Sequence, residues 1–168
     1  MTALSSSIDS NRLRRVLGSF ATGVTIVTTR SAGGRPVGLT ANSFSSVSLS
    51  PPLVLWSLRR DSSAMESFVT ARHWAVHVLS AEQQSLSDRF ARRSEDRFAE
   101  LEIGHGEGGV PLLSDCAAVL QCCTVAQHLA GDHVIFIGEV LACEHREAQP
   151  LVFHAGRYAQ LAPTLCEA

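Results

Sequence analysis

Residues 117–143 of the chain read AAVLQCCTVAQHLAGDHVIFIGEVLAC, and this stretch decides the fold class. It contains two long apolar segments, about Ala117–His128 and His133–Cys143, separated by the short turn Leu129-Ala130-Gly131-Asp132. A short turn with glycine and aspartate joins antiparallel strands, whereas parallel strands need a long crossover connection. The stretch therefore predicts a long antiparallel hairpin.

The rest of the chain extends this hairpin into a sheet. A β-branched run at 24–30, a turn at 31–35 and an extended segment at 36–41 predict a second hairpin. Further strands are expected at 44–49, 53–58, 73–79 and 151–161, and helices at 10–21, 63–69 and 80–92, with a loop over 94–110. Strands outnumber helices and short turns join them, so we expect a mainly β fold with helices, an antiparallel barrel.

The composition bounds the class of protein. A chain of 168 residues and 18.0 kDa suits one domain over residues 1–168, with about the first ten residues as a flexible N-terminal extension. The net charge of −2 and pI near 6.4 predict no nucleic-acid partner, and the absence of a long apolar run predicts no membrane segment. The first residues lack the order of a secretion signal, so we expect a cytoplasmic protein.

Cysteine and lysine usage narrows the chemistry further. Five cysteines without a Cys-x-x-Cys pair indicate neither a disulfide framework nor a zinc knuckle, and we expect them reduced and mostly buried. All fourteen basic residues are arginine. The absence of lysine excludes a Walker-type phosphate loop, a Schiff base and a lysine nucleophile.

The best candidate anion site is the segment Arg59–Glu66. It offers two arginines and two serines, and Ser63 with Glu66 has the spacing of a capping box at a helix start. Backbone N–H groups at such a start, together with serine and arginine side chains, can hold a phosphate. The same pattern also fits an ordinary capped surface helix.

Other candidate motifs carry less weight. The letters of 104–109 match a dinucleotide fingerprint, but Pro111 follows and no helical pattern does, so we expect a loop. His73 and His77 lie four apart in a strand, roughly 13 Å along it, which is too far for one ion, and no metal is predicted. There is no Gly-x-Ser-x-Gly elbow for a hydrolase.

Three blocks of sequence carry a resemblance to a known family. They read FATGVTIVTT at 20–29, GLTANSFSSVSLSPPLV at 38–54 and GDHVIFIGEV at 131–140. In this order and spacing they resemble the short-chain flavin reductases, the reductase components of two-component flavin-dependent monooxygenases. The likeness runs from about residue 11 to residue 161. The chain departs from the family pattern at His77, where asparagine is usual, and at Gln121, where glutamate often precedes cysteine.

The resemblance implies an FMN-binding split β-barrel, usually a homodimer. It implies an NAD(P)H:flavin oxidoreductase in which NADH or NADPH reduces FMN or FAD by hydride transfer to flavin N5. The reduced flavin then diffuses to a partner monooxygenase. The choice between FMN and FAD and the choice between NADH and NADPH stay open. Two alternative functions also stay open. One is a flavin-binding or storage protein of the same fold without turnover, and the other is a small β-barrel interaction module without flavin.

The resemblance also assigns site residues. The residues that match the isoalloxazine-contact segment are Thr40, Ala41, Asn42 and Ser43. Those that match the phosphate-holding strand end and helix start are Ser57, Ser62, Ser63 and Ala64. A further flavin-contact segment matches Arg89, Phe90 and Ala91. On the nicotinamide side the matching positions are His133, expected to position the nicotinamide, and Tyr158.

Overall fold

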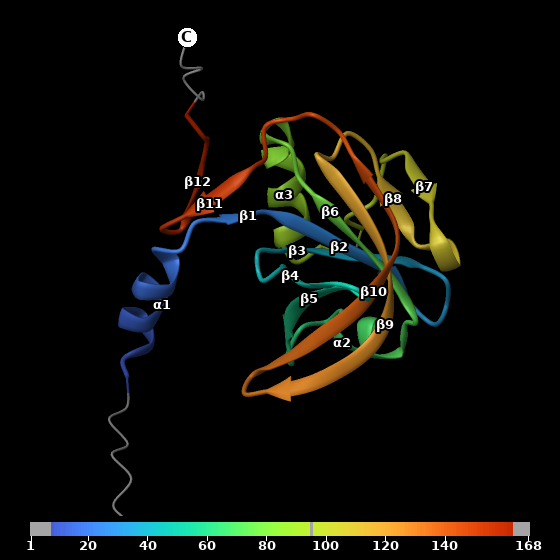
Figure 1. Cartoon of the computed structure of the whole chain (residues 1–168), viewed down its shortest axis with the longest axis horizontal. Helices are drawn as coiled ribbons and strands as arrows, with labels where there is room; N and C mark the ends of the chain where they lie inside the picture. Colours follow the sequence, from blue (N-terminus) through green and yellow to red (C-terminus); the bar gives the residue numbers. More distant parts are fainter. Residues whose placement is uncertain (1–7, 95, 163–168) are drawn as a thin grey trace, which may run out of the picture.

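The computed structural model describes residues 8–94 and 96–162 of the chain. Seven strands form one antiparallel sheet in the order β3-β2-β6-β9-β10-β5-β4 (Figure 1). The bounds are Thr25–Arg30 (β2), Pro36–Ala41 (β3), Ser45–Leu49 (β4), Pro52–Arg59 (β5), His73–Val78 (β6), Ala118–Ala130 (β9) and His133–His145 (β10). Each agrees with its predicted range to within two residues, which confirms the mainly β, antiparallel fold.

The long hairpin is tighter than the sequence indicated. β9 and β10 pair from Ala130 opposite His133 to Ala118 opposite His145, so the turn contains only Gly131 and Asp132. Gly131 has φ +62°, a left-handed conformation that glycine adopts without steric cost and that a two-residue hairpin turn requires. Residues 129 and 130, predicted as turn, therefore continue the strand.

The sheet is open where its two edge strands follow each other in the chain. β3 and β4 are the two edges, and the chain passes from one to the other through residues 42–44. Among the described residues no backbone ladder joins β3 to β4 or β5. Instead the Ser43 hydroxyl donates to the Ser57 carbonyl at 2.9 Å and accepts from the Ser57 N–H at 3.0 Å. One side chain thus replaces a backbone partner at this open edge.

The core lies inside the curved sheet and beneath α2 (Met65–Thr70). Trp56 stacks on Phe136 with ring centroids 5.1 Å apart and meets Phe68 and Trp74 edge to face. Burial of each phenylalanine contributes about 1.5–3 kcal/mol to folding. A Cβ at Gly138 would lie 2.3 Å from Trp74, so β10 can pass this cluster only with glycine at that position.

Two of the three predicted helices begin where expected. α1 spans Ser10–Gly18, which is three residues shorter at its end than predicted, and the carboxylate of Asp9 caps it by accepting from the N–H groups of Asn11 and Arg12. Helix α3 (Gln84–Ala91) follows a short 3₁₀ turn (Ala81–Gln83), and the predicted start at Ser80 is confirmed because the Gln83 side chain accepts from the Ser80 N–H at 3.1 Å.

The predicted capping box of Ser63 and Glu66 is wrong. α2 begins at Met65 with Ala64 in the cap position and without a side-chain cap. Ser62 forms a turn at this point, because its carbonyl accepts from the Met65 N–H at 3.0 Å and its hydroxyl accepts from the Ala64 N–H at 3.3 Å. A serine turn therefore precedes the helix, and the helix starts two residues later than predicted.

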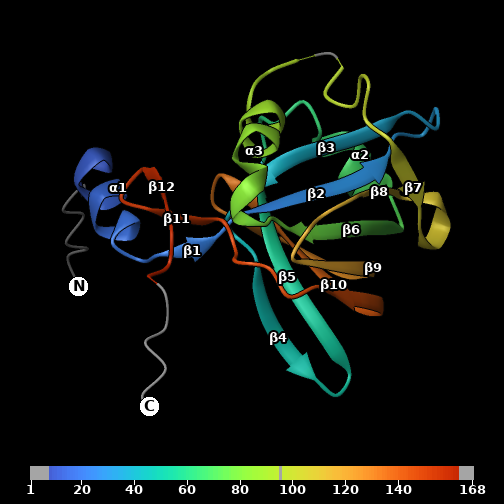
Figure 2. The same ribbon diagram turned by 90° about the horizontal axis from the view of Figure 1, so that it is seen from above.

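The two ends of the described chain form an arm that projects from the sheet (Figures 1 and 2). In it α1 leads to β1 (Thr22–Gly23), which pairs with β11 (Val152–His154), and β11 pairs with β12 (Arg157–Ala159). The final strand predicted over 151–161 is thus a hairpin, broken by Ala155 and Gly156 with positive φ. Residues 1–7 of the predicted N-terminal extension lie outside the described residues.

Segment 94–110 is more ordered than the predicted loop. It contains β7 (Ile103–His105), which pairs with β8 (Pro111–Leu113), and a 3₁₀ turn at Glu107–Gly109. No α-helix follows the glycines of 104–109, in agreement with the rejection of the dinucleotide fingerprint. Within the described residues, none of the helices has the length and apolar character needed to span a membrane.

Candidate functional site

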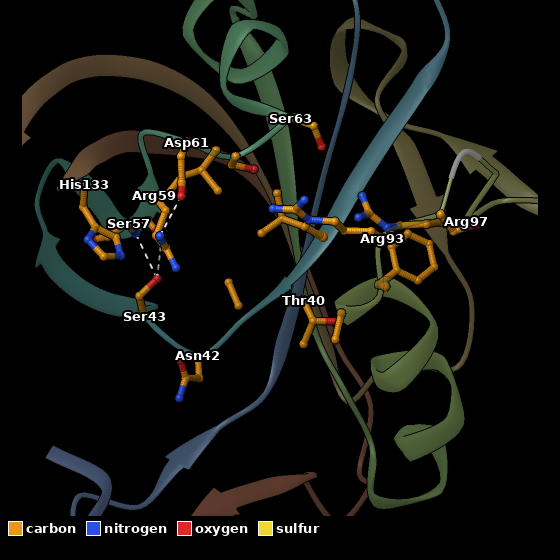
Figure 3. Close-up of a pocket in the computed structure, with 17 residues that line it drawn as sticks. Thr40, Asn42, Ser43, Ser57, Arg59, Asp61, Ser63, Arg93, Arg97 and His133 are labelled. Carbon is orange, nitrogen blue, oxygen red and sulfur yellow. Dashed lines mark hydrogen bonds and ion pairs between the residues drawn. The ribbon is translucent and has the colours of Figure 1, made fainter. Parts of the chain in front are cut away.

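A cleft of about 790 Å³ lies at the open edge of the sheet (Figure 3). Its walls come from the end of β3, the end of β5, the turn before α2, the end of α3, the segment after α3 and the first residue of β10. The lining residues are Leu39, Thr40, Ala41, Asn42, Ser43, Ser57, Leu58, Arg59, Asp61, Ser62, Ser63, Phe90, Ala91, Arg93, Ser94, Arg97 and His133. Segments almost a hundred residues apart in the sequence therefore share one hollow.

Most of the predicted site residues line this cleft. They are Thr40, Ala41, Asn42, Ser43, Ser57, Ser62, Ser63, Phe90, Ala91 and His133. Three predicted residues do not line it. Ala64 is buried in the core, the Arg89 guanidinium donates to the Ala99 carbonyl, and the Tyr158 hydroxyl lies 2.9 Å from both Ser87 Oγ and Asp88 Oδ1.

Several hydroxyls in the cleft hold its walls together. The Thr40 hydroxyl donates to the Ser87 carbonyl at 2.6 Å and so ties β3 to α3. Ser43 ties the segment after β3 to Ser57 on β5, and Ser62 shapes the turn before α2. These side chains fix the relative positions of three walls before any ligand arrives.

Other polar groups in the cleft remain available. The side chains of Asn42, Ser63 and Arg93 make no hydrogen bond to another described residue. An amide, a hydroxyl and a guanidinium together offer donors for a planar heterocycle and for an anionic tail. Figure 3 shows Arg93 and Arg97 reaching in from one side, with His133 on the other.

His133 has a fixed ring. Its Nδ1 lies 2.7 Å from Asp132 Oδ1 in the turn that starts β10, and across the sheet it pairs with Arg59 on β5. This hydrogen bond and the attraction between the two groups lower the pKa of Asp132. The carboxylate is therefore ionised at neutral pH and holds the Nδ1–H tautomer, which leaves Nε2 as the nitrogen for a ligand.

Three arginines line the cleft, and sequence reasoning missed two of them, Arg93 and Arg97. Arg59 forms an exposed ion pair with Asp61 at 2.6 Å. Arg97 donates from Nε to the Arg92 carbonyl and from NH1 to the Gly38 carbonyl, both at 2.9 Å, and burial lowers its pKa. The run of basic residues after α3 was the one sequence signal for these two arginines. The position of Arg97 could not be predicted, because its bonding partner Gly38 lies 59 residues away in the chain.

His77 has a structural role. Its ring is fully buried, with Nδ1 3.1 Å from the Ile26 carbonyl and Nε2 accepting from the Leu113 N–H at 3.1 Å. Both nitrogens are used, and burial lowers the pKa of His77 to about 4. In the described part of the chain no group of histidine, cysteine or acidic side chains has the geometry of a metal site.

The family profile of the flavin reductase like domain matches residues 17–162. The chain belongs to this family. Every residue that lines the cleft of this flavin reductase-like domain lies within the matched range.

Similar proteins with names of their own support the same family. The chain is 46% identical over 152 residues to FMN reductase (NADH) SmoA of Agrobacterium fabrum, covering 90% of this chain and 86% of that protein. It is 48% identical over 128 residues to the reductase component of the flavin-dependent trigonelline monooxygenase of Acinetobacter baylyi, covering 76% of this chain but only 41% of that relative. The NADH:FAD oxidoreductase SgcE6 of Streptomyces globisporus, solved with NAD and FAD fragments, superposes with a TM-score of 0.89 at 38% identity, over 98% of this chain and 99% of that one.

Proposed function

We propose that this chain is an NAD(P)H:flavin oxidoreductase that reduces free FMN or FAD by hydride transfer to flavin N5. It releases the reduced flavin to a partner flavin-dependent monooxygenase. The observation that carries this proposal is the cleft at the open sheet edge, which gathers the segments expected to contact flavin. Relatives named as FMN reductase and as monooxygenase reductase component agree with it.

The cleft fits a flavin in size and in chemistry. A hollow of about 790 Å³ lies within the range of small-molecule sites, roughly 300–1,000 Å³. The apolar Leu39, Leu58 and Phe90 suit the faces of a planar ring system, and arginines and serines at its border suit a phosphate. The fold of the domain agrees with an FMN-binding split barrel, whose split is the open edge between β3 and β4.

The edge of β3 holds the ring system. One side of an edge strand has unpaired backbone N–H and C=O groups, and the residues after it, Asn42 and Ser43, lie in no strand. These groups and the Asn42 amide can hydrogen-bond the polar edge of an isoalloxazine. Donors at that edge stabilise negative charge that develops as a flavin accepts hydride.

The phosphate is held by the turn before α2 and by arginine. The Ser63 hydroxyl and the O–H of Ser62 can donate to phosphate oxygens, and Arg93 supplies a positive charge. Arg59 is available as well, because an exposed ion pair such as that with Asp61 adds little stability and exchanges readily.

His133 positions the nicotinamide. Hydride transfer needs no protein acid or base, so the contribution of this residue is to hold the second ring in contact geometry. With Nδ1 committed to Asp132, Nε2 is the atom that meets the nicotinamide carboxamide. The contacts of Tyr158 with Ser87 and Asp88 favour a role in holding α3, against which the ring system lies.

The decisive experiment follows NADH and, separately, NADPH at 340 nm under air with purified protein, with and without FMN, FAD or riboflavin. We expect oxidation that depends on added flavin. Flavin binding without oxidation would replace the proposal by a non-catalytic flavoprotein. Failure to bind any flavin would favour a β-barrel interaction module.

The domain acts as a homodimer in this proposal, because the arm presents apolar side chains without cover. Leu13, Val16 and Leu17 of α1 and the following Phe20 are 42–78% exposed. A helix of nine residues is marginal in water, so it needs a packing partner, and the second copy of the chain supplies one.

The reaction is proposed to take place in the cytoplasm, where free thiols such as Cys116, Cys122, Cys123 and Cys143 persist.

Light scattering after size-exclusion chromatography tests the dimer. Leu17→Glu, on the apolar face of α1, is expected to shift the protein toward monomer. Arg14→Glu, on the polar face of the same helix, is the matched control and keeps the dimer. A wild-type protein that elutes as a monomer at micromolar concentration would exclude this assembly.

A further inference from the structure

A second hollow adjoins the cleft. It has a volume of about 840 Å³ and lies between the β2–β3 turn, the start of α2 and the segment that follows α3. Ser63, Ser94 and Arg97 line both hollows, so the two spaces adjoin at these residues. Together they extend well beyond what the ring system and phosphate of FMN need.

Arg97 stands at the junction as a fixed cation. Two backbone carbonyls, of Gly38 and Arg92, hold its guanidinium, and no described carboxylate lies within ion-pair distance. Because burial lowers its pKa, a charge-balancing ligand is favoured at this position. The N–H donors that these two bonds leave over can reach an anion at the junction.

Gly38 makes this junction possible. A Cβ on Gly38 would lie 2.9 Å from the Phe90 ring and 3.1 Å from the Phe98 ring. These two rings meet edge to face at 4.9 Å, with Phe90 lining the first hollow and Phe98 the second. The aromatic pair therefore lies directly against β3, and the carbonyl of the same glycine holds Arg97.

The second hollow has the lining of a nucleotide site. Arg35 supplies a second cation, Ser31 and Ser67 supply hydroxyls, and Pro36 and Val37 form an apolar wall. Over both hollows four arginines face two aspartates, an excess of positive charge that suits two linked phosphates. The arginines are Arg35, Arg59, Arg93 and Arg97, and the aspartates are Asp61 and Asp96.

We propose that the second hollow binds the part of FAD that FMN lacks, the adenosine with its phosphate, which makes FAD the preferred flavin of this chain. The inference rests on the proposed function, which puts the flavin phosphate at Ser63. Ser63 is also where the hollows meet, so a mononucleotide ends at this border and a dinucleotide continues across it. The pyrophosphate then lies beside Arg97, and the adenosine lies between Arg35 and the wall of Pro36 and Val37.

Equilibrium titration of riboflavin, FMN and FAD, followed by flavin fluorescence, tests the site without any turnover. Wild type is expected to bind FAD about tenfold more tightly than FMN, since each tenfold corresponds to one well-placed charged contact. Arg35→Ala is expected to remove most of this difference and to leave FMN affinity within about twofold. Arg72→Ala, an exposed arginine away from both hollows, is the control.

A second variant is needed because Arg97 alone could hold FAD, in which case Arg35→Ala would change FAD affinity only slightly. Ser67→Glu puts a carboxylate into the second hollow and is expected to weaken FAD about tenfold while FMN changes less, because like charges repel. Equal affinities of wild type for FAD and FMN, or equal losses for both flavins in the two variants, would overturn the second site.

The outcomes also separate this inference from the proposed function. Absence of binding for all three flavins contradicts the proposed function itself. Normal FMN binding with no FAD advantage contradicts only the second site. NADH is titrated in parallel, and a loss of NADH affinity in Arg35→Ala with unchanged FAD affinity would assign the hollow to the nicotinamide dinucleotide and overturn the assignment to FAD.

Discussion

The closed wall of the sheet around His77 and its open edge around His133 use the same residue type in opposite ways. On β6, His77 is surrounded by β2 and β8, and both ring nitrogens bond to backbone groups. At the start of β10, His133 is half-buried and commits only Nδ1 to a neighbour. His77 lies within the sheet and both its ring nitrogens bond to backbone groups, whereas His133 lies where β10 begins, in the lining of the cleft, and keeps one nitrogen for a ligand.

The open edge is therefore held in place by side-chain hydrogen bonds, although it lacks a partner strand. Ser43 substitutes for a missing strand at Ser57, and Thr40 holds α3. The scaffold bonds come from the hydroxyls of Thr40, Ser43 and Ser62, while Asn42, Ser63 and Arg93 keep their donors. This division separates residues whose loss should cost stability from those whose loss should cost binding or rate.

The largest expected effect concerns the closed wall and depends on pH. Because the folded pKa of His77 is about 4, below its ordinary 6.5, the unfolded chain takes up the proton first as the pH falls. The contribution of His77 to stability is complete above pH 6.5, declines toward pH 4 and is constant below it. The loss over this window is about 3 kcal/mol, measured by urea unfolding at several pH values.

His77→Asn removes the titrating group and keeps an amide that can bond the same backbone groups. Its unfolding free energy is expected to fall less steeply between pH 6.5 and 4 than that of wild type. His128→Asn, at an exposed position on β9, keeps the wild-type slope. Identical slopes for His77→Asn and wild type would show that the buried ring is not the source.

At the open edge the largest expected effect is on rate. His133→Ala should lower kcat/KM for NADH about 100-fold, because loss of ring positioning typically costs this much, while thermal unfolding stays unchanged. His145→Ala, at the other end of β10, is the matched control. A His133→Ala enzyme with unchanged rate and unchanged apparent NADH affinity would exclude the role given to this histidine.

The same comparison explains which parts of the fold could be predicted from the sequence. The seven strands of the large sheet and the helix start at Ser80 could be predicted because β-branched runs, short turns and an N-terminal serine are local signals, whereas the short strands β7 and β8 were not predicted. The Ser63 capping box failed because Ser62 accepts from the Ala64 and Met65 N–H groups and forms a turn, after which the helix begins at Met65. The prediction of one continuous final strand was wrong because Ala155 and Gly156 have positive φ and form a turn, which the sequence pattern does not indicate.

The site was predictable only in part, and mostly through the resemblance. Physical reasoning from the residues alone found the serines and arginines of 59–66. It could not find Arg97, whose position depends on the Gly38 carbonyl, or the second hollow, which forms only when the β2–β3 turn approaches α2. Long-range contacts create these features, and no local pattern encodes them.

The phosphate end of the open edge allows a smaller, differential test. The double variant Ser62→Ala with Ser63→Ala is expected to weaken FMN about tenfold and riboflavin less than twofold, because only FMN carries the phosphate. Of the single variants, Ser63→Ala should have the larger effect, since the Ser62 oxygen already accepts from Ala64. Ser46→Ala on β4 is the control, and equal losses for both flavins in the double variant would contradict the phosphate seat.

The smallest expected effect concerns the carboxylate that fixes His133. Asp132 is fully exposed, and pairs of that kind contribute little, so Asp132→Asn should lower kcat/KM for NADH only about threefold. Because the pKa of Asp132 is lowered, the pair persists over roughly pH 5–8 and is lost only in acid, as the carboxylate takes up its proton. The difference between variant and wild type should therefore be constant over the neutral range and shrink at acid pH. Asp115→Asn, an exposed aspartate far from the cleft, should match wild type throughout, and a loss in Asp132→Asn as large as in His133→Ala would mean that the carboxylate acts on the ligand directly.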